Sequence, residues 1–529
     1  MYDLIFRNAD IYDGLGTDPY VSDIAINGSY ISNIEPSISG KFSKQIDATG
    51  LAVCPGFIDI HSHSDYYLLI NPSAEAKVKQ GITTEVGGNC GYSAAPIGGT
   101  EFEMRRSLYN EQFDLQLSFQ SLDEYLQIIE DQGIAVNYAP LIGHNTIRAS
   151  VMGGSALPCN QKQLLEMGKL VDEGMRHGAF GLSTGLVYSP ANFAEPSELV
   201  ALCEIVAKRG GFFATHMRSE GDLLIDSIQE VLNISKQAQL PIQISHLKTA
   251  GEKNWNKLDA AFDLIEEHRN AGQDVTCDRY PYIASNTHLS ALLPDWAHEG
   301  SLNQKIERLQ KKETRNFLIS ELSQKRNTDK DWDSILISRV LTKKNKNAEG
   351  KTLLQLAKEK SKISSEITLD LLIEEKLNVE IIIFMMNENN MRRIMKKDYT
   401  MVGSDAGALT HKPPLGVGKP HPRNFGTFPQ VLGSLVVKEK LMSMPEAIRK
   451  MTSLPCSRLG IGNRGRVAPE MKADLVLFDP KKIQDKSTYE NPMVYPEGIY
   501  MVLVNGIVVV EDGELTGTTP GIALRKFPS

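Results

Sequence analysis

Eight short apolar runs alternate with stretches of helical periodicity through the middle of this chain, and each run has the length of a strand. Such alternation is typical of repeated strand-helix units that build a parallel sheet. Eight units close a (β/α)8 barrel, and a chain of 529 residues accommodates such a barrel with attached segments. We therefore predict an α/β fold of the TIM-barrel type. The runs are residues 52–58, 82–87, 134–141, 179–182, 212–215, 241–245, 274–277 and 400–404.

The two ends of the chain differ from the middle, because both consist of short β-like pieces separated by turn signals. Near the C-terminus, for example, two apolar pieces flank an Asn505-Gly506 turn. We predict that both ends combine in one small β-sandwich. The expected domains are residues 1–54 and 462–529 for the two parts of the sandwich, and residues 55–461 for the barrel.

A lysine-rich, polar stretch separates the seventh and eighth apolar runs, and we predict an insertion in the barrel near residues 285–355. Two interpretations of this insertion stay open. It is either a segment that folds over the barrel mouth or a solvated helical excursion with no role in function.

Composition and charge narrow the classes of partner. Charged residues make up 23% of the chain, the net charge is -8, and acids and bases are interspersed, which disfavours nucleic acid as a partner. The N-terminus lacks the pattern of a signal peptide and no apolar run approaches 18 residues, which disfavours a membrane. Six cysteines in so long a chain do not make a disulfide framework. We expect a cytoplasmic protein with a small-molecule substrate, and assembly into a homo-oligomer stays open.

Chemistry-bearing side chains follow the apolar runs at the points where strands are expected to end. Residues two apart on a strand share a face, so His61 and His63 after the first run can chelate one divalent metal. An isolated pair of this kind is more often two exposed histidines at a strand end. The coincidence of several such side chains favours a shared metal site, because active sites of these barrels lie at the strand ends. The other members are Cys90, His216, His246 and Asp405.

Zinc is the metal that this donor set favours. Two imidazoles and a thiolate are borderline-soft ligands and leave an open position for water, whereas magnesium or calcium would require oxygen ligands.

The sequence resembles the amidohydrolase superfamily, and within it the N-acyl-D-amino-acid deacylases, or D-aminoacylases, over nearly the whole chain. A cysteine at position 90 distinguishes this family from hydantoinases and dihydroorotases, which bridge two metals with a carboxylated lysine. The motifs that carry the resemblance are PGFIDIHSH (residues 55–63), QGITTEVGGNCG (80–91), THMRSEG (215–221), QISHLK (243–248), GSD (403–405) and HPRNFGT (421–427).

The resemblance implies roles for the strand-end residues. Cys90, His216 and His246 would hold one tightly bound Zn2+, and His61 and His63 would form an adjacent, weaker site. Asp405 would act as the general base that accepts a proton from water and then protonates the leaving amine. The implied reaction is hydrolysis of the amide bond of N-acyl-D-amino acids, which releases a D-amino acid and a carboxylate.

Lys248, Tyr280 and Arg423 are our candidates for binding the substrate carboxylate, since a carboxylate product requires cationic partners. Lys248 lies two residues beyond His246, Tyr280 follows the seventh run, and Arg423 lies in the loop after Asp405. The plainer alternative makes Lys248 and Arg423 solvated loop charges and Tyr280 a packing residue. We interpret His144, Arg218 and Glu220 as supporting or structural residues.

Two rival functions stay open at this point. The same site could cleave a cyclic amide, such as a hydantoin or dihydroorotate, or an aminoacyl ester. A noncatalytic assembly protein with the same barrel would be expected to lack some of the ligands, and none is lacking here.

Overall fold

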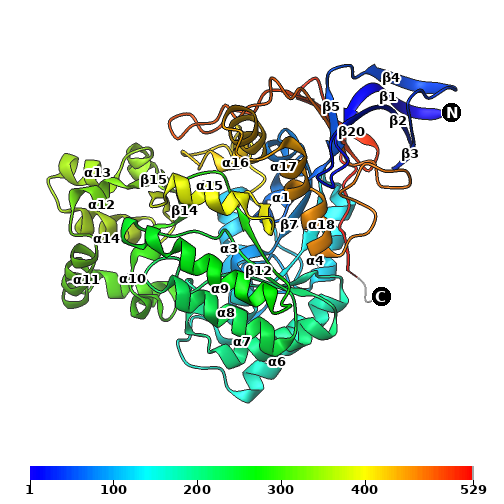
Figure 1. Cartoon of the computed structure of the whole chain (residues 1–529). Helices are drawn as coiled ribbons and strands as arrows, with labels where there is room; N and C mark the ends of the chain where they lie inside the picture. Colours follow the sequence, from blue (N-terminus) through cyan, green and yellow to red (C-terminus); the bar gives the residue numbers. More distant parts are fainter. Residues whose placement is uncertain (527–529) are drawn as a thin grey trace.

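The computed structural model describes residues 1–526, which form four hydrogen-bonded sheets. Two of these sheets contain only parallel strands and lie in the middle of the molecule (Figure 1), with strand orders β6-β7-β8 and β17-β13-β12-β11-β10-β9. Just beyond β6 and β17, Ser62 and Ala406 form a parallel bridge between the two sheets. The strands are β6 (Phe57–Asp59), β7 (Ile82–Gly87), β8 (Asn137–Pro140), β9 (Ile142–Gly143), β10 (Gly181–Gly185), β11 (Phe212–His216), β12 (Ile242–Ile244), β13 (Val275–Arg279) and β17 (Thr400–Val402).

Helices follow these strands and cover their outer side, as α6 to α9 do in the lower part of Figure 1. In α8 (Leu224–Ala238), Ile228, Val231 and Leu232 are buried, and this spacing of three and four residues gives the helix one apolar face toward the sheet. The other helices of this part are α1 (Tyr67–Ile70), α2 (Glu75–Val78), α3 (Gly99–Phe113), α4 (Leu122–Gln132), α5 (His144–Met152), α6 (Gln161–Arg176), α7 (Pro196–Lys208), α9 (Leu258–Asn270), α15 (Glu388–Lys396), α16 (Arg423–Gln430), α17 (Met444–Met451) and α18 (Ser453–Leu459).

The two chain ends form a single hydrogen-bonded sheet of nine strands, seen at the upper right of Figure 1. Its main path is β21-β20-β19-β18-β5-β1-β2-β3, and β4 pairs with β1. Apolar side chains from both ends, such as Phe6 and Leu475, pack in one buried cluster. The strands are β1 (Tyr2–Ile11), β2 (Tyr20–Asn27), β3 (Tyr30–Glu35), β4 (Phe42–Asp47), β5 (Ala52–Pro55), β18 (Leu475–Phe478), β19 (Ile499–Val504), β20 (Ile507–Glu511) and β21 (Glu514–Leu515).

The first apolar run, residues 52–58, is not one strand as predicted. It divides at Gly56, so that β5 joins the terminal sheet and β6 joins the parallel sheet. A Cβ atom at Gly56 would lie 2.2 Å from Oγ1 of Thr83, so only glycine allows this close passage. The division places the start of the parallel sheet directly beside the terminal sheet.

The insertion between β13 and β17 is a folded unit with its own core, which includes Leu318, Leu356, Ile367 and Ile381. It carries an antiparallel sheet in the order β14-β16-β15. Because β16 comes last in the chain, the unit extends to Phe384 and is longer than residues 285–355. Its elements are β14 (Ala284–His288), α10 (Leu302–Gln310), α11 (Lys312–Lys325), α12 (Asp329–Asp333), β15 (Ile335–Arg339), α13 (Leu353–Lys360), α14 (Ser364–Glu374) and β16 (Glu380–Phe384).

Among residues 1–526, none of the helices has both the length and the apolar composition that crossing a bilayer requires.

Candidate metal centre

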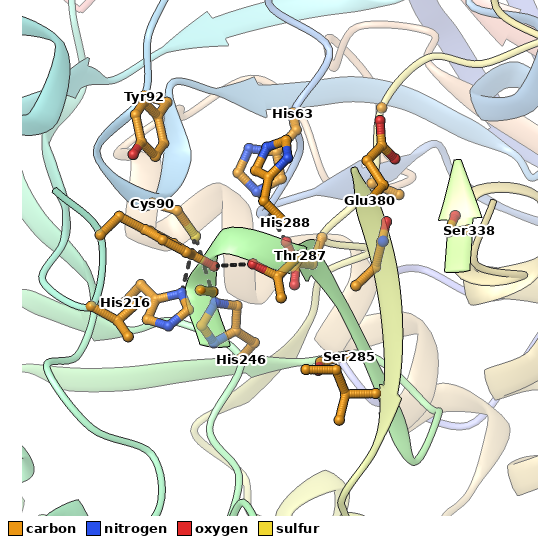
Figure 2. A pocket seen from close by; sticks show the side chains of 18 of the residues that line it. His63, Cys90, Tyr92, His216, His246, Ser285, Thr287, His288, Ser338 and Glu380 are labelled. Atoms are coloured by element: carbon orange, nitrogen blue, oxygen red, sulfur yellow. Dashed lines mark hydrogen bonds and ion pairs between the residues drawn. The ribbon is translucent and has the colours of Figure 1, made fainter. Parts of the chain in front are cut away.

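One buried thiol lies at the centre of the predicted site. Sγ of Cys90 is 3.3 Å from Nε2 of His61, 3.7 Å from Nδ1 of His216 and 3.5 Å from Nε2 of His246. Figure 2 shows the thiol pointing toward the last two imidazoles. Four different segments of the chain therefore converge on one sulfur atom.

A second set of ligand atoms shares the same thiol. Nε2 of His63 lies 3.0 Å from Oδ1 of Asp405, and Nε2 of His61 lies 3.5 Å from the same oxygen. The ligand atoms of His61, His63, Cys90 and Asp405 all lie within 4.8 Å of one another, as do those of Cys90, His216 and His246. The arrangement offers two adjacent cation positions with Cys90 common to both.

His216 is the last residue of β11, but most of the other side chains reach this point from turns that follow the strands. β6 ends at Asp59 and β12 ends at Ile244, so His61, His63 and His246 all lie beyond a strand end. The expectation that strand alternation orients His61 and His63 is therefore wrong, and Lys248 likewise lies beyond the end of β12. Three non-glycine residues adopt left-handed backbone instead, with φ of 51° at Cys90, 34° at His246 and 52° at Asp405. Each costs on the order of 1 kcal/mol, so the surrounding contacts must hold these turns in place.

Opposite charges stabilise one another within the cluster. Burial alone would raise the pKa of the Cys90 thiol, but the His61 and His246 imidazoles lower it well below its ordinary value. Burial likewise opposes ionisation of Asp405, yet Arg423 and His61 hold the pKa of that carboxyl well below its ordinary value. A thiolate and a carboxylate at the centre are negative charges that a divalent cation can neutralise.

Asp278, which the sequence analysis did not identify, orients two of the imidazoles. Its Oδ1 lies 3.0 Å from Nδ1 of His61 and accepts a hydrogen bond of 2.9 Å from the backbone N–H of His246. Its Oδ2 accepts a bond of 2.6 Å from the Gln243 amide. The contact to Nδ1 leaves Nε2 of His61 facing Cys90, as a metal ligand requires. The available signal was a carboxylate one residue beyond the seventh apolar run.

Glu220 plays a similar part for His246. An oxygen of its carboxylate lies 2.8 Å from Nδ1 of His246, and the Lys248 ammonium donates to the same oxygen. Burial would raise the pKa of Glu220, but Lys248 and the two neighbouring histidines lower it well below its ordinary value. This geometry agrees with the interpretation of Glu220 as a residue that supports a metal ligand, His246. His144 and Arg218 do not contact the cluster and pair instead with Glu198 at 2.8 Å and Glu230 at 2.9 Å.

The three candidates for carboxylate binding lie beside the cluster. Nη1 of Arg423 donates to Oδ2 of Asp405 over 2.8 Å, and the guanidinium carbon lies 4.8 Å from the centre of the Tyr280 ring. Nζ of Lys248 lies 2.8 Å from Nδ1 of His246. Arg423 and Lys248 are buried, so neither is a solvated loop charge, and Tyr280 is buried beside them.

These residues open onto a cavity of about 740 Å3. Part of its lining comes from the inserted sheet, including Thr287, His288, Ser338 and Glu380, which are labelled in Figure 2. The hydroxyl of Tyr188 lies 3.1 Å from Oγ1 of Thr287 and links the parallel strands to the insertion. The insertion therefore borders the cavity. This supports the interpretation that it folds over the barrel mouth, and not that it is a solvated excursion without a role.

Comparison with known proteins agrees with the fold and the donor set. The model of the amidohydrolase family matches residues 44–510. The chain is 32% identical to D-aminoacylase of Alcaligenes xylosoxydans xylosoxydans over 99% of this chain and 98% of that protein. It is 33% identical to N-acyl-D-aspartate deacylase of the same organism over 99% of this chain and 95% of that protein.

Solved structures of the same kind of enzyme also superpose on this chain. A crystal structure of D-aminoacylase superposes with a TM-score of 0.84 at 32% identity, covering 99% of this chain and 100% of the other. N-acyl-D-glutamate deacylase from Bordetella bronchiseptica, in complex with zinc and a phosphonate inhibitor, superposes with a TM-score of 0.84 at 29% identity, covering 99% of each chain. The chain belongs to the amidohydrolase family and, within it, to the D-aminoacylases, which confirms the resemblance seen in the sequence.

Proposed function

We propose that this protein hydrolyses the amide bond of N-acyl-D-amino acids and releases a D-amino acid and a carboxylate. The observation that carries the proposal is the shared thiol of Cys90 among four imidazoles, with Asp405 and Arg423 in direct contact at the same cavity. The relatives named above include D-aminoacylase and a deacylase of N-acyl-D-aspartate, and each is similar to this chain over 99% of its length.

Zinc is the metal we propose for this centre. Cys90, His216 and His246 would hold the tight site, because one thiolate and two imidazoles suit zinc better than an oxygen-seeking cation. His61 and His63 would form the weaker site with the same thiolate. When bound, zinc supplies Lewis acidity that polarises the amide carbonyl and makes water more acidic.

Asp405 is the proposed proton carrier. Its carboxylate lies between the imidazole of His63 and the guanidinium of Arg423, which keep it ionised and fix its direction. In this position it can accept a proton from the attacking water and pass it to the nitrogen of the departing amine. Both transfers occur at one carboxylate, so no second acid is required.

The α-carboxylate of the substrate would bind to Arg423, Tyr280 and Lys248. Within residues 1–526, the buried Nε of Arg423 and the buried hydroxyl of Tyr280 have no hydrogen-bond partner. Unpartnered buried donors are unfavourable, and an incoming carboxylate would satisfy both. The Arg423 guanidinium would then contact Asp405 and the substrate together, which sets the distance between the base and the anchored end of the substrate.

We also propose that the parallel strands close into a (β/α)8 barrel and that the terminal sheet curls into a β-sandwich. The bridge between Ser62 and Ala406 supports closure, and the apolar cluster shared by the two chain ends supports the sandwich. The corresponding domains are residues 1–54 with 462–526 and residues 55–461; residues 527–529 of the predicted terminal domain lie outside the described residues. The cytoplasm stays the predicted compartment.

The proposed function is tested by release of amine from paired N-acetyl-D- and N-acetyl-L-amino acids by zinc-loaded protein. We expect hydrolysis of the D-substrates and at least tenfold slower hydrolysis of the L-substrates. Hydantoin, dihydroorotate and an aminoacyl ester serve as the competing substrate classes. Faster turnover of any of these than of every N-acetyl-D-amino acid would replace the proposed function.

A further inference from the structure

A completely buried lysine, Lys77, contacts the segments that carry His63 and Asp405. The side chain of Lys77, in α2, is 0% exposed, and its Nζ lies 2.7 Å from Oδ2 of Asp59, 3.0 Å from Oγ of Ser404 and 2.8 Å from the backbone oxygen of Ala406. A buried ammonium requires compensation of this kind. None of the roles in the proposed reaction uses this lysine.

The contacts of Lys77 fall on both sides of Asp405. Ser404 precedes Asp405 and Ala406 follows it, and Lys77 donates to an atom of each. Asp59 reinforces the first contact, because its Oδ1 accepts a bond of 2.8 Å from the backbone N–H of Ser404. Asp405 itself has the left-handed backbone described above, with φ of 52°. Lys77 therefore holds both neighbours of Asp405 in place, and Asp59 helps to hold the first of them.

The same cluster reaches the segment that carries His63. Glu85 is fully buried, and its Oε2 accepts hydrogen bonds from the hydroxyls of Ser62 and Ser64, the two neighbours of His63. Nζ of Lys77 lies 3.7 Å from the same Oε2 and 3.4 Å from Oγ of Ser62. The backbone N–H of His63 also donates to the backbone oxygen of Ala406 over 3.0 Å.

We propose that Lys77 is a positioning residue that holds Asp405 in register with His63 for proton transfer. The inference rests on the proposed function, in which Asp405 carries the proton. Lys77 contacts neither the cavity nor the cluster of metal ligands; it acts through Ser404, Ala406 and Ser62. A displacement of Asp405 by about 1 Å would misdirect its carboxylate, and misplacement of that size can lower the rate about a hundredfold.

The test compares Lys77→Met with Lys79→Met in the full-length, zinc-loaded protein. Lys79 is a matched control, since it is only 8% exposed and lies two residues further on, but its Nζ pairs with Glu514 at 3.0 Å on the terminal sheet. For each variant kcat, KM, zinc content and Tm are measured on one N-acetyl-D-amino acid. We expect Lys77→Met to lower kcat by about a hundredfold, with KM within about threefold and zinc content unchanged. Lys79→Met should keep the wild-type kcat.

Ser404→Ala is the second variant, because Lys77→Met leaves Asp59 and Glu85 without a cation and could prevent folding. It removes one hydroxyl between Lys77 and Asp59 and should lower kcat by about tenfold, again with unchanged zinc. An unchanged kcat in folded Lys77→Met, or in Ser404→Ala where Lys77→Met does not fold, overturns the proposal. The proposal is also overturned if the fall in kcat is fully explained by a lower zinc content or by a smaller fraction of folded protein. Absence of turnover by the wild-type protein would instead refute the proposed function.

Discussion

The guanidinium of Arg423 donates from Nη1 to Oδ2 of Asp405 over 2.8 Å, and both side chains are largely withdrawn from solvent. This pair joins the proposed proton carrier to the proposed anchor for the substrate carboxylate. The two charges of a buried ion pair attract each other more strongly than those of a surface pair. Removing one partner is destabilising, because the other charge stays buried without compensation. Changes at Arg423 should therefore affect both binding and turnover.

The first prediction concerns Arg423→Lys. Lysine keeps the charge but cannot bind Asp405 and a carboxylate at once through a planar fork, so kcat/KM should fall about ten- to a hundredfold. Steady-state kinetics on an N-acetyl-D-amino acid and on its neutral amide analogue measure the effect. The wild-type protein should prefer the acid, and Arg423→Ala should largely erase that preference.

Arg218→Lys is the control, because Arg218 lines the same cavity but pairs with Glu230. Its kcat/KM should stay within about threefold of wild type. If Arg423→Ala still favoured the acid as strongly as wild type, Lys248 and Tyr280 would have to carry the recognition.

The second prediction concerns the shared thiol. Cys90→Ala should lose most of the bound zinc, since Cys90 is the only thiolate in either group of ligands found among residues 1–526. Elemental analysis of the purified variant measures the metal content. Cys203→Ala, at a buried thiol in α7, should keep the wild-type zinc content. Full zinc and full activity in Cys90→Ala would exclude the thiolate as a ligand.

The third prediction concerns Asp278→Asn. Three donors, from His61, His246 and Gln243, converge on the two oxygens of Asp278, and asparagine offers a single acceptor oxygen. At least one imidazole should lose its orientation, which lowers zinc affinity or kcat about ten- to a hundredfold. Competition with a chelator measures the affinity.

Asp274→Asn is the matched control, because Asp274 directly precedes the same strand and pairs with Arg458 at 2.6 Å. It should bind zinc like the wild type. Equal affinity of Asp278→Asn and wild type would show that the histidines keep their orientation without this carboxylate.

Much of the fold could be predicted from the sequence, because each parallel strand is a short buried run and buried runs are visible as apolar residues. The division of residues 52–58 between two sheets could not, since it depends on contact between Gly56 and Thr83, which are distant along the chain. In the inserted sheet, β14 gives no apolar run, because it is largely half-buried and carries the polar sequence ASNTH.

Some residues of the candidate site could likewise be predicted from the sequence, and others could not. Cys90, His216, His246 and Asp405 follow apolar runs, so their convergence is expected of parallel strands. Asp278 and Lys77 act by contact with residues far away in the sequence. The position of Asp278 after the seventh apolar run is a weak signal, and Lys77 has no such signal. A buried charge is recognisable only when its partners are known.

The measurement that tests the account most directly is turnover by Asp405→Asn, combined with its zinc content. Asparagine has nearly the shape of aspartate but cannot accept the proton, so kcat on an N-acetyl-D-amino acid should fall about two to four orders of magnitude. Zinc should remain bound, because Cys90, His216 and His246 form a complete group without Asp405. A zinc-loaded Asp405→Asn protein with nearly wild-type kcat would contradict the account, since proton transfer would then not pass through this carboxylate.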